Sequence, residues 1–355
     1  MTTSETRSAA RGRDTAAANV RAYGGITPEA WRGRGRYVEM PDCRVFAVEL
    51  GAGAAGDAAK TPLLILHGFP TSSWDFAECA SILARERRVV LFDFLGFGFS
   101  DKPHDAGYSL FEQAEVASAV ARSFGLGSAH IWGHDMGTSV TTELLSRRER
   151  GNLPFEVASV TLMNGSVHIE MASLTLGQKI LRTPAGGLFS RIANRNVFVR
   201  QMRRIFGKQP APEALDGMWD LMAREEGTLR MPQLIKYVDE RYRFRRRWIG
   251  ALERNDLPFL VAWGAKDPVA VLPIAERLAN ETPGAEDLVT WDDLGHYPQV
   301  EDPPRVAETI ASFLRRVDDG TASGPRSGRG FCGAGARRGR RRAARGESEK
   351  GDRER

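Results

Sequence analysis

The chain has 355 residues, 42% of them hydrophobic and 27% charged, which suits one large α/β domain with an insertion or two ordinary domains. It contains no run of about 18 or more uninterrupted apolar residues, so we expect no membrane span. The formal net charge is +5, but residues 321–355 carry ten Arg and one Lys against three Glu and one Asp. Residues 1–320 are therefore slightly acidic, and nucleic acid is an unlikely partner for them.

The first part of the chain predicts strands that alternate with helices. Residues 1–30 lack the apolar core of a secretory signal and are expected to form a flexible segment. Two strands, 36–40 and 44–50, flank Pro41-Asp42 as a hairpin, and the Gly/Ala-rich stretch 51–59 predicts a loop. The apolar run 62–66 is typical of a buried strand, and a helix over 74–85 and a strand over 88–93 follow.

The same alternation continues to the end of the predicted domain, with one interruption. Ser109 caps a predicted helix that reaches Phe124, and strands are predicted at 129–132, 157–164, 258–263 and 287–291, before a final helix at 304–316. This order predicts a mostly parallel sheet, with core segments 31–167 and 250–316. Residues 168–249 are helical, basic and aromatic instead, and we expect them to form an inserted cap. Residues 317–355 predict a disordered Arg/Gly-rich tail.

The central motif is Gly133-His134-Asp135-Met136-Gly137, which separates an apolar strand from a predicted helix. A strand, a turn with glycine at both ends and a helix form a nucleophile elbow, in which the middle residue has a strained backbone. Asp135 occupies the position where a lipase or esterase would carry serine. The motif therefore predicts a carboxylate nucleophile.

Two further residues complete a predicted catalytic triad. Asp267 follows the predicted strand 258–263, and His296 follows the last predicted strand. Each has a structural alternative, because Asp267 precedes Pro268 and suits a turn, and a single histidine can simply pack in a core. The order nucleophile, acid, histidine is nevertheless that of α/β-hydrolases, so the three positions together predict a triad.

An aspartate nucleophile limits the reaction. A carboxylate is ionised at neutral pH and needs no base for attack on an sp³ carbon, where it forms an alkyl ester. His296 would then activate the water that hydrolyses the ester, and Asp267 would orient the imidazole. The expected leaving group is a halide or an opened epoxide oxygen. The alternative is an esterase that lost its serine.

Backbone donors and aromatic residues complete the predicted site. The N–H groups of Phe69 and Met136 are expected to form the oxyanion hole. No metal or cofactor is expected, since the three cysteines are not spaced as metal ligands. The candidates for substrate binding are aromatic residues in the cap or beside the elbow: Trp74, Trp219, Tyr237, Tyr242 and Trp248.

Several motifs resemble a known family. His67-Gly68-Phe69-Pro70, Gly133-His134-Asp135 and the loop 96–103 are similar to the haloalkane dehalogenase and epoxide hydrolase branch of the α/β-hydrolase superfamily. The stretches 67–76, 93–103, 244–252 and 296–303 resemble the mesoderm-specific transcript protein family more closely. The resemblance covers roughly residues 25–316. It implies an α/β-hydrolase fold with an inserted helical cap.

The chain also departs from the pattern of that branch. Dehalogenases usually carry Trp after the nucleophile and many have Asn at the position of Phe69, so Met136 and Phe69 leave a halide without those side-chain donors. Trp219 or Trp248 could replace them. Epoxide hydrolases use two cap tyrosines, for which Tyr237 and Tyr242 are the candidates.

The sequence thus predicts a cytoplasmic hydrolase of the haloalkane dehalogenase type that acts on a small apolar molecule. Alternatives are an epoxide hydrolase, a non-catalytic family member that binds a ligand or partner, and a binder of nucleic acid or anionic surfaces through the tail. The sequence does not indicate the oligomeric state.

Overall fold

The computed structural model describes residues 25–51 and 60–322. The predicted flexible segment 1–30 is therefore described only from Gly25, and most of the predicted loop 51–59 and tail 317–355 lies outside the described residues. The described part is built on one eight-stranded sheet with the order β1-β2-β4-β3-β5-β6-β7-β8. The strands are β1 (Gly35–Glu39), β2 (Arg44–Leu50), β3 (Leu63–Leu66), β4 (Val89–Phe92), β5 (Ser128–His134), β6 (Glu156–Met163), β7 (Phe259–Gly264) and β8 (Ala285–Trp291).

The sheet is parallel except at one edge, as predicted. β1 and β2 form an antiparallel hairpin, and β2 pairs antiparallel with β4, whereas all pairs from β4 to β8 are parallel. Every residue of β3, β4 and β7 is buried, because helices cover both faces of a parallel sheet. Burial on both faces explains why the sequence of these strands is continuously apolar.

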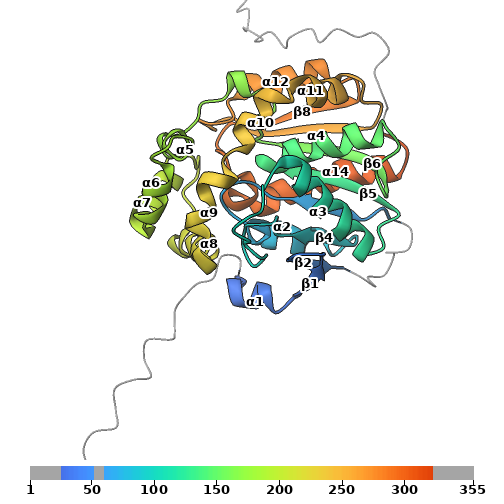
Figure 1. Cartoon of the computed structure of the whole chain (residues 1–355). Coiled ribbons are helices and arrows are strands. Elements are labelled where there is room, and N and C mark those ends of the chain that lie inside the picture. The colour runs from blue at the N-terminus through green and yellow to red at the C-terminus, as the bar shows by residue number, and fades with distance from the viewer. Residues whose placement is uncertain (1–24, 52–59, 323–355) are drawn as a thin grey trace, which may run out of the picture.

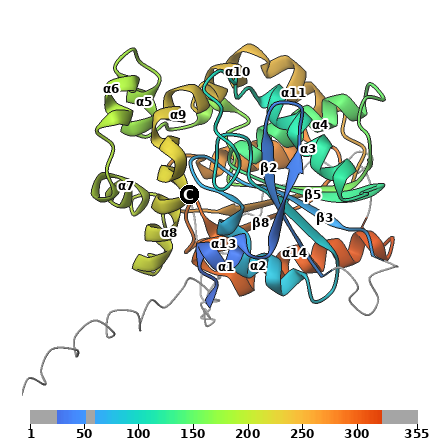
Figure 2. The same ribbon diagram turned by 60° about the horizontal axis from the view of Figure 1, so that its bottom comes forward.

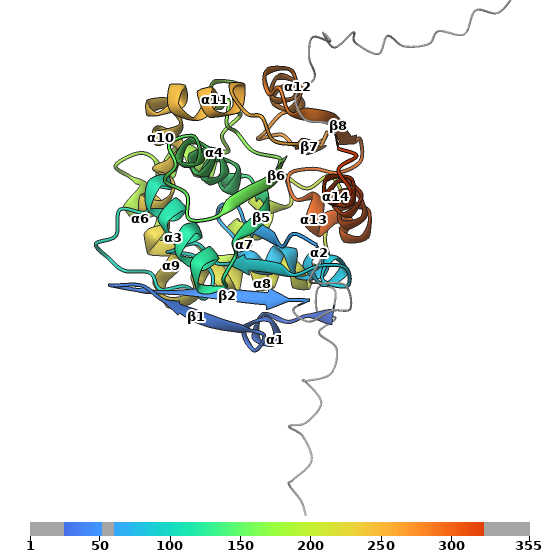
Figure 3. The same ribbon diagram turned by 90° about the vertical axis from the view of Figure 1, so that its right-hand side faces the viewer.

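Helices form a layer on each face of the sheet. α2 (Ala77–Leu83), which follows the 3₁₀ turn η3 (Ser73–Phe76), packs against α14 (Pro303–Asp318) on one face. On the other face, α4 (Met136–Arg148) lies between α3 (Leu110–Ser123) and α11 (Arg245–Glu253) (Figure 3). The shorter helices are α1 (Pro28–Arg32) near the hairpin, α12 (Leu272–Glu281) against β7 and β8, and α13 (Pro298–Glu301) before α14.

Short helices fill the chain between β6 and β7. They are η4 (Ile169–Met171), α5 (Leu176–Leu181), α6 (Gly186–Arg191), α7 (Arg195–Met202), α8 (Pro212–Ala223), η5 (Arg224–Glu226), α9 (Gly227–Leu234) and α10 (Tyr237–Arg243). Helices α5 to α9 stand together at one side of the core (Figures 1 and 2). Helix α11 begins before the predicted end of the insertion at residue 249 and packs against α4 of the core.

The last helix extends two residues into the predicted tail. Asp318 forms an ion pair with the buried Arg87 at 3.0 Å and contacts His130 at 3.1 Å. Arg87 and His130 hold the C-terminal turn of α14 against the core. The composition of residues 317–355 does not predict these contacts. Among the described residues, no helix is both long and apolar enough to cross a membrane.

Candidate active site

The elbow between β5 and α4 places Asp135 in a strained conformation. Its φ of 44° and ψ of −108° are rarely adopted by residues other than glycine. The turn packs closely against its neighbours: a Cβ on Gly137 would lie 2.2 Å from the carbonyl oxygen of Leu66. A Cβ on Gly68 would lie 2.8 Å from the Cβ of Asp135. The glycines therefore allow the loop after β3 to reach the aspartate.

The side chain of Asp135 is held by a backbone donor from that loop. The N–H of Phe69 donates to Oδ2 of Asp135 at 2.8 Å, and the residue is only 3% exposed. Met136 is the first residue of α4, so its N–H has no acceptor within the helix. Of the two predicted backbone donors, Phe69 thus contacts the carboxylate directly, and Met136 begins the helix that follows it.

A buried arginine that sequence analysis did not identify also contacts the elbow. The guanidinium of Arg241, on α10, donates to the carbonyl oxygen of Asp135 at 3.0 Å and to Oγ of Ser139 at 2.7 Å. Its Nη2 lies 3.8 Å from Oδ1 of Asp135, and the guanidinium lies over the ring of Tyr237. Arg241 thereby connects the inserted helices to the predicted nucleophile with a positive charge. No spacing or motif distinguishes it from the other arginines nearby.

Asp267 and His296, the predicted acid and base of the triad, lie in contact. Nδ1 of His296 is 2.6 Å from Oδ2 of Asp267, a distance at which the ring donates to the carboxylate. The backbone N–H groups of Val269 and Ala270 donate to Oδ1 of Asp267 at 2.7 and 3.0 Å. The carboxylate is therefore fixed in position, and it holds the imidazole of His296 through Nδ1.

Asn164 at the end of β6 is a second residue that the sequence does not indicate. It has a positive φ of 46°, and its Nδ2 donates to Oδ2 of Asp267 at 2.8 Å. The same amide lies 3.3 Å from the carbonyl oxygen of Gly264 and 3.2 Å from that of Gly295. Asn164 thus joins the ends of three chain segments around the acid and the histidine.

The environment of His296 sets its protonation. Burial lowers the pKa of His296, but the charge of Asp267 and the hydrogen bond to it outweigh this effect, and the charge of Asp135 acts in the same direction. The net result is that the pKa of His296 is raised above its ordinary value. Neighbouring His134 differs, because burial keeps its pKa well below the ordinary value and its ring contacts the carbonyl oxygen of His296 at 2.7 Å.

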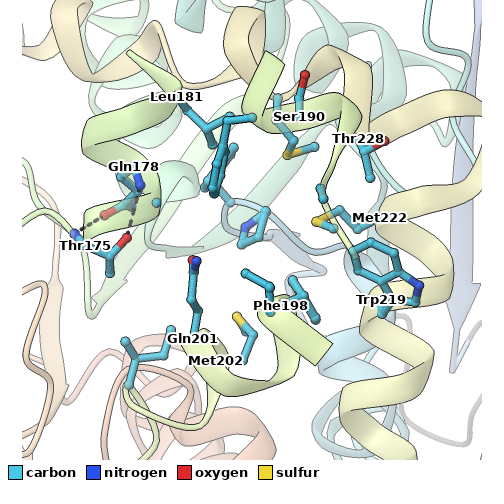
Figure 4. A pocket seen from close by; sticks show the side chains of 18 of the residues that line it. Thr175, Gln178, Leu181, Ser190, Phe198, Gln201, Met202, Trp219, Met222 and Thr228 are labelled. Carbon is cyan, nitrogen blue, oxygen red and sulfur yellow. Dashed lines mark hydrogen bonds between the residues drawn. The ribbon is translucent and has the colours of Figure 1, made fainter. Parts of the chain in front are cut away.

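A mainly apolar cavity of about 850 Å³, counted with its open mouth, lies above His296 and Phe69. Figure 4 shows that its walls come from α5, α7 and α8, whose side chains surround one common space. Three amide side chains add hydrogen-bonding capacity to the walls, those of Gln178, Asn194 and Gln201. The apolar part of the lining includes Leu181, Phe189, Phe198, Met202, Ile205, Trp219, Met222 and Met231.

Of the five aromatic candidates for substrate binding, Trp219 lines this cavity. Tyr237 is buried beside it, with its ring centroid 5.7 Å from that of Phe69 and a hydrogen bond to Gln178. Burial, followed by the charge of Asp135, raises the pKa of the Tyr237 hydroxyl. This hydroxyl therefore keeps its proton at neutral pH.

The other three candidates lie elsewhere, each for a packing reason. The indole N–H of Trp74 donates to the carbonyl oxygen of Ile26 at 3.0 Å, and its ring packs beneath α8. Trp248 donates to Glu143 on α4 at 2.9 Å, within the layer between α11 and the core. Tyr242 is 52% exposed and its hydroxyl is 3.5 Å from the carbonyl oxygen of Ile169. None of the three lines the cavity.

Two of the three arginines at 245–247 form ion pairs with other segments. Arg247 donates to Oε2 of Glu143 at 2.6 Å and joins α11 to α4, and Arg245 pairs with Glu170 at 2.7 Å. The described residues contain no group of three or more His, Cys, Asp or Glu side chains that could hold a metal ion.

Comparisons with known proteins agree with this architecture. The family model described as the alpha/beta hydrolase fold matches residues 61–303. The chain is 42% identical to the protein of Mycobacterium tuberculosis named hydrolase LipZ, over 80% of this chain and 96% of that protein. It is 35% identical to the human mesoderm-specific transcript homolog protein, over 80% of this chain and 87% of that protein. The crystal structure of the haloalkane dehalogenase DbeA from Bradyrhizobium elkanii matches with a TM-score of 0.68 at 19% identity, over 81% of this chain and 99% of the other.

Proposed function

The chain belongs to the α/β-hydrolase family, and we propose that it is a hydrolase whose nucleophile is the carboxylate of Asp135. The proposed substrate is an apolar molecule with a leaving group on an sp³ carbon. The product of the first step is a covalent alkyl ester on Asp135. Asp267 and His296 serve the second step, in which water hydrolyses this ester.

The hydrogen bond from Phe69 to the carboxylate is the observation that carries the proposal. It holds Oδ2 of Asp135 and leaves Oδ1 as the attacking oxygen. In the first step, Oδ1 forms a bond to the sp³ carbon while the bond to the leaving group breaks, and the leaving group departs with the electron pair. A serine hydroxyl would need a base for this attack, whereas a carboxylate does not.

The second step uses the same hydrogen bond. His296 takes a proton from water through Nε2, and the hydroxide attacks Cγ of Asp135. The negative charge then develops on Oδ2, which accepts from the N–H of Phe69, and the N–H of Met136 at the start of α4 is the proposed second donor. Collapse of this intermediate breaks the bond between Cγ and Oδ1, so the alcohol product leaves with Oδ1 and takes a proton from His296.

The insertion acts as a cap in this proposal, since α5, α7 and α8 supply most of the cavity wall. The apolar walls favour an apolar substrate. An epoxide hydrolase receives less support, because Tyr237 lies beside the elbow but Tyr242 is turned towards solvent. We therefore propose a halide leaving group first and an epoxide second.

A single turnover in ¹⁸O-labelled water tests the mechanism. Enzyme in excess over 1-bromohexane, or over 1,2-epoxyhexane in a parallel sample, is quenched and digested. The peptide that contains Asp135 is expected to gain about 2 Da, while the oxygen transferred to the substrate carbon stays unlabelled, because water attacks Cγ and not the substrate.

Label in the newly formed alcohol, with none in the peptide, would mean that water attacks the substrate directly. No turnover of halides, epoxides or the ester p-nitrophenyl butyrate would favour the alternative of a non-catalytic binding protein. A parallel sample without substrate controls for slow exchange of the carboxylate oxygens.

The two chemical steps are expected to differ in their dependence on pH. Esterification removes the charge of Asp135, which is one of the causes that raise the pKa of His296 in the free enzyme. The pKa of His296 should therefore be lower in the ester intermediate, which keeps the base deprotonated when it is needed. We expect the rate of ester hydrolysis to fall with decreasing pH around a pKa below the value that NMR titration of the free enzyme gives for His296. Equal values would show that Asp135 does not lose its charge.

A further inference from the structure

The outer surface of α5 and α6 exposes large apolar side chains. Leu176, Leu188 and Ile192 are 71%, 64% and 65% exposed. Among the described residues, Tyr242 is the one other large hydrophobic side chain with comparable exposure. Leu188 and Ile192 are four residues apart and so lie on the same side of α6 and its C-terminal turn. Exposed apolar groups that gather in this way mark a surface that binds something.

Each of these three exposed residues is next in sequence to a residue that lines the cavity. Leu176 lies between Thr175 and Gly177, both of which line the cavity, and Leu188 precedes the lining residue Phe189. Ile192 likewise precedes Ala193, another lining residue. The exposed face is therefore the outer side of the same wall that encloses the cavity. In Figures 1 and 2 this wall stands away from the central sheet.

The charge of this segment is strongly one-sided. Residues 171–212 contain no Asp or Glu, but they contain two Lys and six Arg. Arg182 and Arg195 pair with Asp239 and Asp216 of neighbouring helices, and Lys208 pairs with Asp293 and Asp302. The other five cations are exposed and have no acidic partner within the described residues: Lys179, Arg191, Arg200, Arg203 and Arg204.

We propose that the outer face of α5 to α7 docks onto an anionic lipid bilayer. Apolar side chains that enter the acyl region, surrounded by cations at the level of the headgroups, are the pattern of an interfacial surface. Phosphates of nucleic acid would satisfy the cations but would leave Leu176, Leu188 and Ile192 in water. Charge complementarity and the apolar residues together therefore favour a membrane. This binding does not depend on the proposed reaction.

Flotation of the full chain with lipid vesicles tests the proposal. We expect binding to vesicles of phosphatidylcholine with about 30 mol% phosphatidylglycerol, and much weaker binding to phosphatidylcholine alone. The double variant Leu188→Ser/Ile192→Ser should reduce the partition coefficient about tenfold. Arg191→Gln/Arg200→Gln should reduce it about 25-fold, because each cation near the surface contributes about a factor of five.

Matched controls separate this surface from the Arg-rich residues 321–355, which all variants keep. Tyr242→Ser removes the fourth exposed hydrophobic side chain, and Arg122→Gln removes an exposed cation on α3. Both controls are expected to bind as the unchanged protein does, and thermal unfolding verifies that every variant is folded. Full binding of both double variants, or equal loss in the controls, would overturn the proposal. Binding should survive in the His296→Gln variant, whatever the outcome for catalysis.

Discussion

Replacement of His296 by Gln is expected to stop each enzyme molecule after Asp135 has been alkylated once. The carboxylate of Asp135 needs no base for attack, so the first step proceeds, but the water that must cleave the ester loses its base. Steady-state turnover should fall by about 10³-fold, and the alkylated enzyme should accumulate. Gln also removes the ring that contacts Asp267 at 2.6 Å and leaves that carboxylate with its backbone and Asn164 donors.

Intact-protein mass spectrometry measures this result directly. The variant should gain the mass of the alkyl group of the substrate in a stoichiometric burst of bromide, and peptide analysis should locate the group on Asp135. Asp135→Asn is the matched control, because it is nearly isosteric and should give neither a burst nor an adduct. An adduct that persists in Asp135→Asn would identify a different nucleophile.

Replacement of Arg241 by Met is expected to reduce both stability and the chemical rate. The guanidinium is 2% exposed and makes hydrogen bonds to the carbonyl oxygen of Asp135 and to Ser139. Its removal takes the arginine donor from Ser139 and the positive charge from beside Asp135, although Thr138 and the N–H of Phe69 still donate to Asp135. We expect a cost of about 3 kcal/mol in the free energy of unfolding. Because the elbow loses one of its anchors, we expect kcat to fall about 10²-fold with little change in KM.

A second arginine separates the two effects. Arg247 joins α11 to the same helix α4 through Glu143, but its contacts do not include the elbow. Arg247→Met should therefore destabilise the protein while kcat stays near its original value. Arg241→Lys keeps the charge but not the two-point contact, and we expect it to recover stability better than activity. If the two Met variants lose equal activity, Arg241 has only a structural role.

The sheet, and the places of Asp135, Asp267 and His296 after its strands, could be predicted from the sequence because they depend on local patterns. Apolar runs between turn residues identified the strands, and chain order placed Asp267 and His296 after the correct ones. The sequence analysis expected the N–H of Phe69 to be an oxyanion-hole donor. The structure shows it donating to Asp135, because Gly68 permits the close approach.

The remaining parts of the site depend on contacts between distant segments. Arg241 looks like any helical arginine until α10 is placed over the elbow, and Asn164 looks like any strand terminus. Trp74 and Trp248 were attractive candidates as aromatics near the motifs. The structure instead uses Trp74 to support α8 at Gly217 and Trp248 to join α11 to Glu143. Composition alone cannot reveal which neighbour a buried side chain meets.

The glycines of the elbow have a consequence for which substitutions this turn can accept. Gly68, Gly133 and Gly137 have no room for even a methyl group, since their neighbours would lie within 2.9 Å of it. The side chain at position 135, by contrast, accepts from the N–H of Phe69, and its charge acts on His296. Substitution of these glycines is therefore expected to deform the turn, whereas substitution of Asp135 is expected to change the chemistry of the site and leave the turn in place.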